Sequence, residues 1–154
     1  MPLYDLLSAQ RVAILDRPGD RDAVLDRAAH LLADGQASAA LALRTRLGER
    51  ERLASTAIGH GVAIPHARTA LVDASRAAFL RLNAPVDFAA ADGEPVDLVL
   101  AMAIPEHHIQ QHLQLLAELA ERFADAGFRE RLRSAAGQAE LADRLLDHCR
   151  RSAA

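Results

Sequence analysis

Residues 54–66 have the sequence Ala54-Ser55-Thr56-Ala57-Ile58-Gly59-His60-Gly61-Val62-Ala63-Ile64-Pro65-His66. Small, β-branched and glycine residues replace here the pattern rich in Leu and Arg that precedes them. This composition, with glycines on both sides of a turn, is typical of two short β-strands. The segment therefore predicts a strand–turn–strand unit in a chain that is otherwise mostly helical in pattern.

The residues at the end of this segment restrict the backbone next to His66. Gly59 and Gly61 allow a tight turn and leave bare backbone that another molecule can approach closely. Ile64 precedes a proline and is pushed into an extended conformation, and Pro65 has a fixed φ and no N–H. His66 is thus expected at the rigid end of a strand, where a scaffold can present a reactive group. From the spacing alone, an ordinary strand-end histidine is the simpler interpretation.

Helical and strand patterns alternate through the rest of the chain. The expected helices lie at 20–35 with Asp20 as N-cap, from 38 to about Gly48, at 109–123, at 128–134 and at 139–150. The other expected strands are Arg76–Leu82, ended by Asn83-Ala84-Pro85, and the apolar run Val96–Ile104. No linker or repeat interrupts them, so the pattern predicts one α/β domain over 1–154.

Composition excludes several classes of protein. Only 3% of residues are aromatic, the net charge is −3, and no basic stripe is present, which argues against nucleic-acid binding. All basic residues are Arg, so no catalytic or nucleotide-loop Lys is available. No apolar run reaches the roughly 20 residues that span a bilayer, and no signal peptide is visible. The lone Cys149 cannot form an internal disulfide, so we expect a cytoplasmic protein, with no role for this residue.

His112 is a second candidate for chemistry. The apolar stripe expected on helix 109–123 consists of Ile109, Leu113, Leu116, Ala120 and Phe123. Helical phase places His112 beside this stripe, facing a sheet edge or a shallow cleft. The alternative is a partly buried histidine bonded to a backbone carbonyl.

A metal site is not expected among the histidines. His108 and His112 are four residues apart and can reach one ion, but zinc sites need three or four protein ligands. Cys149 is distant in sequence, and no Glu lies between the two histidines as in metalloproteases. His107 and His108 are expected to be solvated at the helix start. No Gly-x-Ser-x-Gly hydrolase elbow or glycine-rich phosphate loop is present.

The segment from Arg50 to His66 resembles the signature of the fructose/mannitol/nitrogen class of enzyme IIA domains of the bacterial phosphotransferase system. The resemblance continues through 84–88, 95–100, His112 and 131–133 in the family's order, with the signature core at about 50–135. It implies an α/β fold with a central mixed β-sheet flanked by helices on both faces. The chain is most similar to the stand-alone nitrogen-regulatory (PtsN-type) branch, because no other transport domain accompanies it.

The resemblance also implies a mechanism. In this family the His after Ile-Pro is phosphorylated, so His66 would accept a phosphoryl group on Nε2 from a phosphohistidine carrier protein (HPr/NPr-like). His112 would donate a hydrogen bond to the phosphoryl oxygens, and Arg50 would supply a guanidinium. No metal or organic cofactor is implied.

Five further residues are expected around the acceptor. Ser55 and Thr56 would line the site or pair in the sheet, and Gly59 and Gly61 would keep its rim flat for a protein partner. His60 stands where the nitrogen-type string commonly has Asn. It would tune His66 or hold the phosphoryl group, although a surface turn residue is the simpler interpretation. Ala67 replaces a common Gly, which slightly limits the backbone after His66.

Two outputs are compatible with such a carrier. In the regulatory one, the phosphorylation state of His66 switches contacts with target proteins, since a doubly negative phosphate can repel a partner. In the alternative, the chain passes phosphate to an enzyme IIB of a sugar uptake system.

Overall fold

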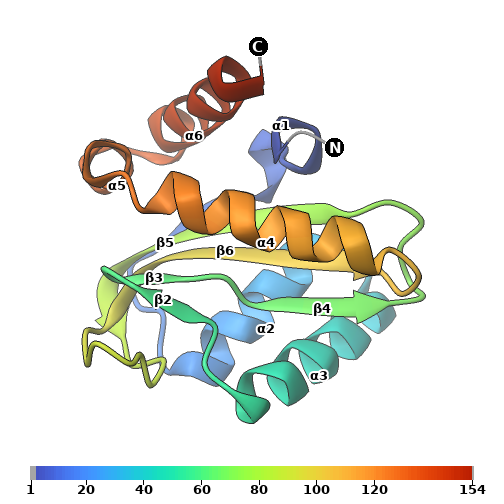
Figure 1. The fold of residues 1–154 in the computed structure, drawn as a ribbon. Helices are drawn as coiled ribbons and strands as arrows, with labels where there is room; N and C mark the ends of the chain where they lie inside the picture. The colour runs from blue at the N-terminus through green and yellow to red at the C-terminus, as the bar shows by residue number, and fades with distance from the viewer. Residues whose placement is uncertain (1–2, 154) are drawn as a thin grey trace.

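A mixed six-stranded sheet organises the fold of the computed structural model, which describes residues 3–153 (Figure 1). The strand order is β1-β5-β6-β3-β2, and β4 also pairs with β6. The strands are β1 (Val12–Leu15), β2 (Ala57–Gly59), β3 (Val62–Ala63), β4 (His66–Thr69), β5 (Arg76–Val86) and β6 (Val96–Pro105). Parallel β1–β5, β3–β6 and β4–β6 pairs combine with antiparallel β5–β6 and β2–β3 pairs, which confirms the expected mixed sheet.

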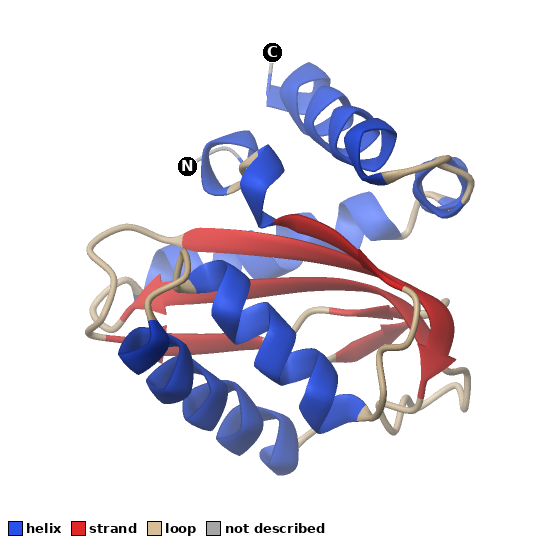
Figure 2. Ribbon diagram, turned by 180° about the vertical axis from the view of Figure 1, so that it is seen from behind, coloured by secondary structure: helices blue, strands red, loops and turns tan. Residues whose placement is uncertain are grey.

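Helices cover both faces of the sheet, as expected. The helices are α1 (Leu3–Leu6), η1 (Ala9–Arg11), α2 (Arg21–Leu32), α3 (Ala37–Leu53), α4 (Ile109–Phe123), α5 (Ala126–Arg133) and α6 (Gln138–Ala153). Figure 1 shows α4 lying across one face, and Figure 2 shows α2 and α3 on the other. The buried apolar residues accordingly form two clusters, one between the sheet and α1, α4, α5 and α6, and one between the sheet and α2 and α3.

Strand β6 is buried on both faces, as its apolar composition predicts. The residues that point toward α4 are Leu98, Leu100, Met102 and Ile104. The residues that point toward α2 and α3 are Val99, Ala101 and Ala103. Side chains alternate along a strand, so one continuous apolar run supplies both cores.

Six elements differ from the sequence expectation. Helix α3 continues through Gly48 to Leu53, because the cost of one helical glycine, about 1 kcal/mol, is outweighed by the burial of neighbours such as Leu43 and Leu47. Strand β5 does not end at 83–85 but resumes pairing at Val86, opposite Val96, after an irregularity. The short α1, η1, β1 and β4 were not expected at all.

The apolar stripe expected on α4 was wrong in part: Phe123 is buried and Leu116 packs against the core as expected, but Ala120 is exposed. Leu115, Leu119 and Phe123 are the residues of this helix that are buried. Ile109 and Leu113, which were expected to face inward, are 54% and 61% exposed. The sheet-facing side of α4 is thus rotated toward the phase 112, 115, 119 and 123. His112 therefore lies on the buried face of the helix, at its N-terminal end.

The sheet edge next to these helices is partly open. Strand β4 pairs with β6, and within residues 3–153 no further strand lies on its other side, since β2 pairs there with β3 alone. Helix α3 contacts β4 from one face, and the first turn of α4 lies on the opposite face (Figure 1). Side chains from all three elements can therefore meet at this edge.

Candidate functional site

His66 begins β4 at this sheet edge. Its backbone lies opposite Met102 of β6, and Met102 N–H donates to the Pro65 carbonyl at 2.9 Å. Pro65 cannot donate, so its fixed backbone leads the chain from β3 into β4 with its carbonyl bonded. The His66 side chain is 7% exposed. His66 is thus the first residue of a strand, directly after the fixed backbone of Pro65.

Two hydrogen bonds determine the protonation of the His66 ring. Nδ1 lies 2.8 Å from the Ile64 carbonyl oxygen, which can only accept, so Nδ1 carries the hydrogen. Arg50 Nε donates to Nε2 at 3.3 Å, which requires a lone pair on Nε2. Both contacts describe the same neutral tautomer. Nε2 is therefore the ring nitrogen that carries the lone pair.

Arg50 reaches His66 from the last turn of α3. Its Nη1 donates to the Ala54 carbonyl at 2.8 Å, just beyond the end of the helix. This bond anchors the guanidinium while Nε contacts His66. The contact exists because α3 continues past Gly48 to Leu53.

His112 meets His66 from the first turn of α4. The two ring centroids are 4.9 Å apart, and the rings are inclined by 71°. His112 Nε2 is buried and has no hydrogen-bond partner among residues 3–153. A buried polar atom without a partner is uncommon and often marks a functional site.

Burial and nearby charge keep both histidines neutral. The pKa of His66 is lowered from 6.5 to about 4, first by burial and then by the positive charge of Arg50, with His112 and Arg68 adding to the effect. The bond to the Ile64 carbonyl opposes this shift. The pKa of His112 is also lowered, by burial and then by Arg68 and Arg50. At neutral pH the Nε2 lone pair of His66 is therefore available.

The two histidines open into a cavity of about 290 Å³ at the sheet edge. Its lining residues are Arg46, Glu49, Arg50, Leu53, His66, Ala67, Arg68 and His112. Three arginines against one acidic residue make this a place for an anion. The sequence expectation missed Arg46 and Arg68. Arg46 precedes Arg50 by one helical turn and Arg68 follows His66 by one strand repeat. These spacings indicate the site only once α3 is known to continue past Gly48 and β4 is known to begin at His66.

Ser55 and Thr56 do not line this cavity. Ser55 Oγ donates to the Phe88 carbonyl at 2.5 Å and accepts from Ala57 N–H. Thr56 N–H and Oγ1–H both donate to the carboxylate of Glu51, at 3.0 and 2.6 Å. These bonds fix the start of β2 against the end of α3. Glu51, only 2% exposed, was not expected to have a role.

The Gly59–Gly61 turn lies away from His66. Val62 is opposite Leu98 and His66 is opposite Met102, four residues or about 13 Å further along β6. His60 is exposed with φ of 58°, and its N–H donates to Asp92 at 3.0 Å. His60 therefore occupies a surface turn, the simpler of its two interpretations. It does not line the cavity around His66.

Gly61 is required by the packing of this turn. Its φ is +77°, and a Cβ there would lie 2.7 Å from Arg133 Nη2 and 2.8 Å from Asp97 Oδ1. Arg133 pairs with Asp97 through two bonds of 2.9 Å and also donates to the His60 carbonyl. The glycine thus permits an ion pair that holds the turn to the start of β6 and the end of α5.

No metal centre is indicated. Among residues 3–153, no group of three His, Cys, Asp or Glu side chains is placed to hold an ion. His107 is exposed, and exposed His108 precedes the first residue of α4.

No helix in the described part of the chain is long and apolar enough to cross a membrane.

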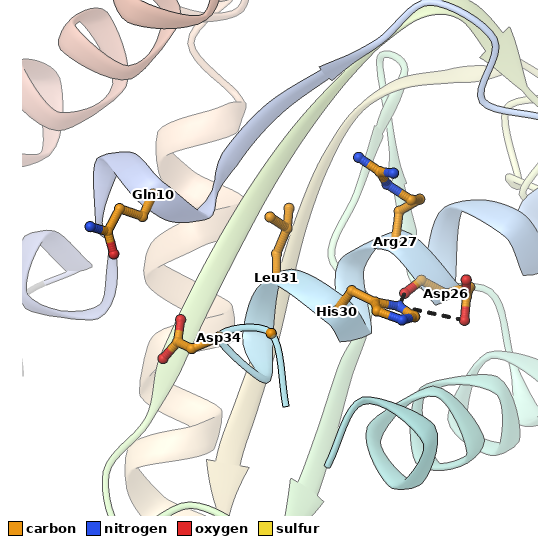
Figure 3. Close-up of a pocket in the computed structure, with 7 residues that line it drawn as sticks. Gln10, Asp26, Arg27, His30, Leu31 and Asp34 are labelled. Carbon is orange, nitrogen blue, oxygen red and sulfur yellow. Dashed lines mark hydrogen bonds and ion pairs between the residues drawn. The ribbon is translucent and has the colours of Figure 1, made fainter. Parts of the chain in front are cut away.

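A larger cavity, about 530 Å³, lies elsewhere, on the outer side of α2 (Figure 3). Both carboxylates that line it already have partners within the protein. Asp34 pairs with Arg11 and Arg76, and Asp26 Oδ1 lies 3.7 Å from His30 Nδ1 and 3.8 Å from Arg44 Nε. The cavity at His66 has unpaired polar groups and is the better candidate despite its smaller volume.

Comparison with known proteins shows the family of this chain. Residues 5–148 match the family described as phosphoenolpyruvate-dependent sugar phosphotransferase system, EIIA 2. A nitrogen regulatory protein of Pseudomonas aeruginosa is 39% identical over 134 residues, covering 86% of this chain and 87% of that protein.

Two solved structures are also similar. The nitrogen regulatory protein IIA-Ntr of Neisseria meningitidis superposes with a TM-score of 0.85 at 32% identity, over 93% of this chain and 98% of that one. IIA mannitol of Escherichia coli has a TM-score of 0.72 at 21% identity, over 90% and 98% of the two chains, and supports the fold alone.

Proposed function

This chain belongs to the EIIA 2 family of the phosphoenolpyruvate-dependent phosphotransferase system, and on that premise we propose that it carries a phosphoryl group on Nε2 of His66. The proposal rests on the state of the His66 ring. The ring is neutral, its Nδ1–H is bonded to the Ile64 carbonyl, and Nε2 carries the lone pair that can attack phosphorus. Phosphoryl transfer asks a protein mainly for positioning and for positive charge, and this site supplies both.

In the transfer step the phosphoryl group passes from the donor histidine to His66. The Nε2 lone pair forms a new N–P bond while the donor's N–P bond breaks, and its electron pair returns to the donor ring. Positive charge develops on the His66 ring as the bond forms. The Ile64 carbonyl stabilises this charge through Nδ1–H, so no proton needs to leave during transfer.

Arg50 and His112 are the proposed ligands of the phosphoryl oxygens. Arg50 Nε now donates to the Nε2 lone pair, and it transfers that bond to an oxygen when phosphorus takes the lone pair. The ring of His112 contacts His66, and its Nε2 has no protein partner among the described residues. An N–H at that position can donate to a second oxygen. Charge-assisted bonds of this kind are about twice as strong as neutral ones.

Exposed apolar side chains support a protein as the donor. Leu53, at the mouth of the cavity, is 83% exposed, and Leu113, one residue from His112, is 61% exposed. Large exposed apolar groups beside a reactive residue are typical of a protein–protein contact. A phosphohistidine carrier protein of the HPr/NPr type is the proposed donor.

The proposed output is regulatory, through target proteins whose binding depends on phosphorylation. The relative from Pseudomonas aeruginosa, similar over most of its length, is called a nitrogen regulatory protein. The alternative is transfer to an enzyme IIB, which the description of the family as a sugar phosphotransferase system supports. A pull-down with the phosphorylated and unphosphorylated forms distinguishes a state-dependent target from an enzyme IIB that removes the phosphate.

The central test is location of the phosphate. The chain is incubated with phosphoenolpyruvate, enzyme I and the carrier protein, and the modified peptide is identified by mass spectrometry under conditions that preserve phosphohistidine. We expect the phosphate on His66 and none on His66→Asn, whose amide can keep the bond to the Ile64 carbonyl. Phosphate retained by the folded variant would refute the assignment.

A further inference from the structure

We propose that Arg68 is a second arginine that binds the phosphoryl group on His66 Nε2, acting together with Arg50 but from a different element. The inference rests on the proposed function of His66 and extends it. It adds a catalytic residue that contacts the transferred group.

The strand geometry places Arg68 beside the acceptor. His66 and Arg68 are two residues apart on β4, so their side chains lie on the same face, about 6.5 Å apart along the strand. Their backbone partners Met102 and Ile104 point toward α4, which carries His112. Arg68 lines the same cavity as both histidines.

Arg68 also has its donors free. Of the arginines that line the cavity, Arg50 is bonded to Ala54 and His66, and Arg46 pairs with Glu106 at 3.6 Å. Arg68 makes no hydrogen bond or ion pair with any residue in the range 3–153. A guanidinium has five N–H donors in a planar fork that fits phosphate oxygens in pairs.

The charges of Arg50 and Arg68 act on the histidine pair differently. Arg50 lowers the pKa of His66 more than Arg68 does, whereas Arg68 lowers the pKa of His112 more than Arg50 does. Both guanidinium charges therefore act on both rings, and a phosphoryl group on His66 Nε2 would enter a cavity that Arg50 and Arg68 both line.

Arg68 has more donors available than Arg50 at the start of transfer. Arg50 Nε is bonded to the lone pair that must attack, so it becomes available to oxygen only as the N–P bond forms. Arg68 can bind the phosphoryl group before that moment, while it is still on the donor. Positive charge present before the bond forms favours entry of a dianion into this partly buried site.

The test uses Arg68→Gln and Arg68→Lys, with Arg52→Gln as the matched control. Arg52 is an exposed arginine of α3 that lines a different cavity, so its replacement removes one positive charge without touching the site. Each variant is phosphorylated by two donors, the phosphorylated carrier protein and the small molecule phosphoramidate. Single-turnover rates are followed by mass spectrometry of the intact chain.

We expect Arg68→Gln to slow phosphorylation about tenfold with both donors, as for the loss of one charge-assisted hydrogen bond. Arg68→Lys should be slowed less, because it keeps the charge but not the fork, and Arg52→Gln should stay within about twofold. Unchanged melting temperatures are expected for all three, since both arginines are exposed.

Two results would overturn the inference. If Arg68→Gln slows transfer from the carrier protein but not from phosphoramidate, Arg68 acts in docking of the protein donor. If its rate is unchanged with both donors, Arg68 has no part in transfer. Failure of the proposed function is separate, because it would appear as wild-type protein that takes no phosphate on His66 from either donor.

Discussion

The lowered pKa of His66 predicts a measurable loss of stability in acid. In the unfolded chain His66 takes up a proton near its ordinary pKa of 6.5, whereas in the folded protein it stays neutral down to about 4. Between these values the unfolded state binds more protons, so the free energy of unfolding falls as the pH falls. At about 1.4 kcal/mol per pH unit, the interval from 6.5 to 4 corresponds to about 3 kcal/mol.

The perturbation that isolates this effect is His66→Asn. The variant lacks the titrating ring, while other groups with lowered pKa values, such as His112, Asp92 and Glu140, are common to both proteins. Urea unfolding followed by circular dichroism gives the free energy of unfolding of each protein at several pH values from 7 to 4. The free energy of unfolding of the wild type minus that of the variant should decrease by about 3 kcal/mol from pH 7 to pH 4.

Parallel stability curves for the two proteins would refute the reasoning. A direct check is the NMR titration of the His66 ring, with an expected midpoint near 4 and the nitrogen shifts of an Nδ1–H tautomer. A midpoint above 6 would show that burial does not set the protonation of this ring. The same pKa predicts that the reactivity of His66 toward phosphoramidate is constant from pH 8 down to about 5.

Two further predictions concern the segment before His66. Gly61→Ala should cost about 2 to 3 kcal/mol of unfolding free energy and Gly35→Ala about 1, because both have positive φ but only the Cβ at 61 would meet Arg133; equal losses in urea unfolding would contradict the steric argument. Glu51→Ala should cost about 2 to 4 kcal/mol, because it leaves the N–H and hydroxyl of Thr56 buried without an acceptor; a loss under about 1 kcal/mol would show that water replaces the carboxylate.

Local signals made parts of the fold predictable. Asp20 accepts from Ala23 N–H at the start of α2, as its N-cap position predicts. Helix α4 spans 109–123, as expected, although part of the apolar stripe that predicted it was wrong, and the glycine-flanked hairpin is present. Each of these depends on residues close together in sequence, where capping, turn chemistry and periodicity act directly.

Other parts depend on contacts that local sequence does not contain. β1 has only four residues and exists because Val12 pairs with Phe79, far along the chain. Packing against the sheet determines which side of α4 is buried, so Leu115 and Leu119 are buried and Leu113 is exposed. At the site, proximity of His66 to His112 was expected from the family resemblance, whereas Arg68 required the register of β4.

The segment 54–66 turns out to contain two separable functions. Its first half is structural, since Thr56 ties β2 to Glu51 at the end of α3 and Gly61 admits the ion pair that holds the hairpin to β6. Its second half places His66 at an edge that no other strand covers. The hairpin must be fixed in register on β6 before β4 can continue along the same strand. A contiguous signature is therefore what this chemistry requires, because an error of one residue would turn the His66 side chain to the opposite face of the sheet, away from His112.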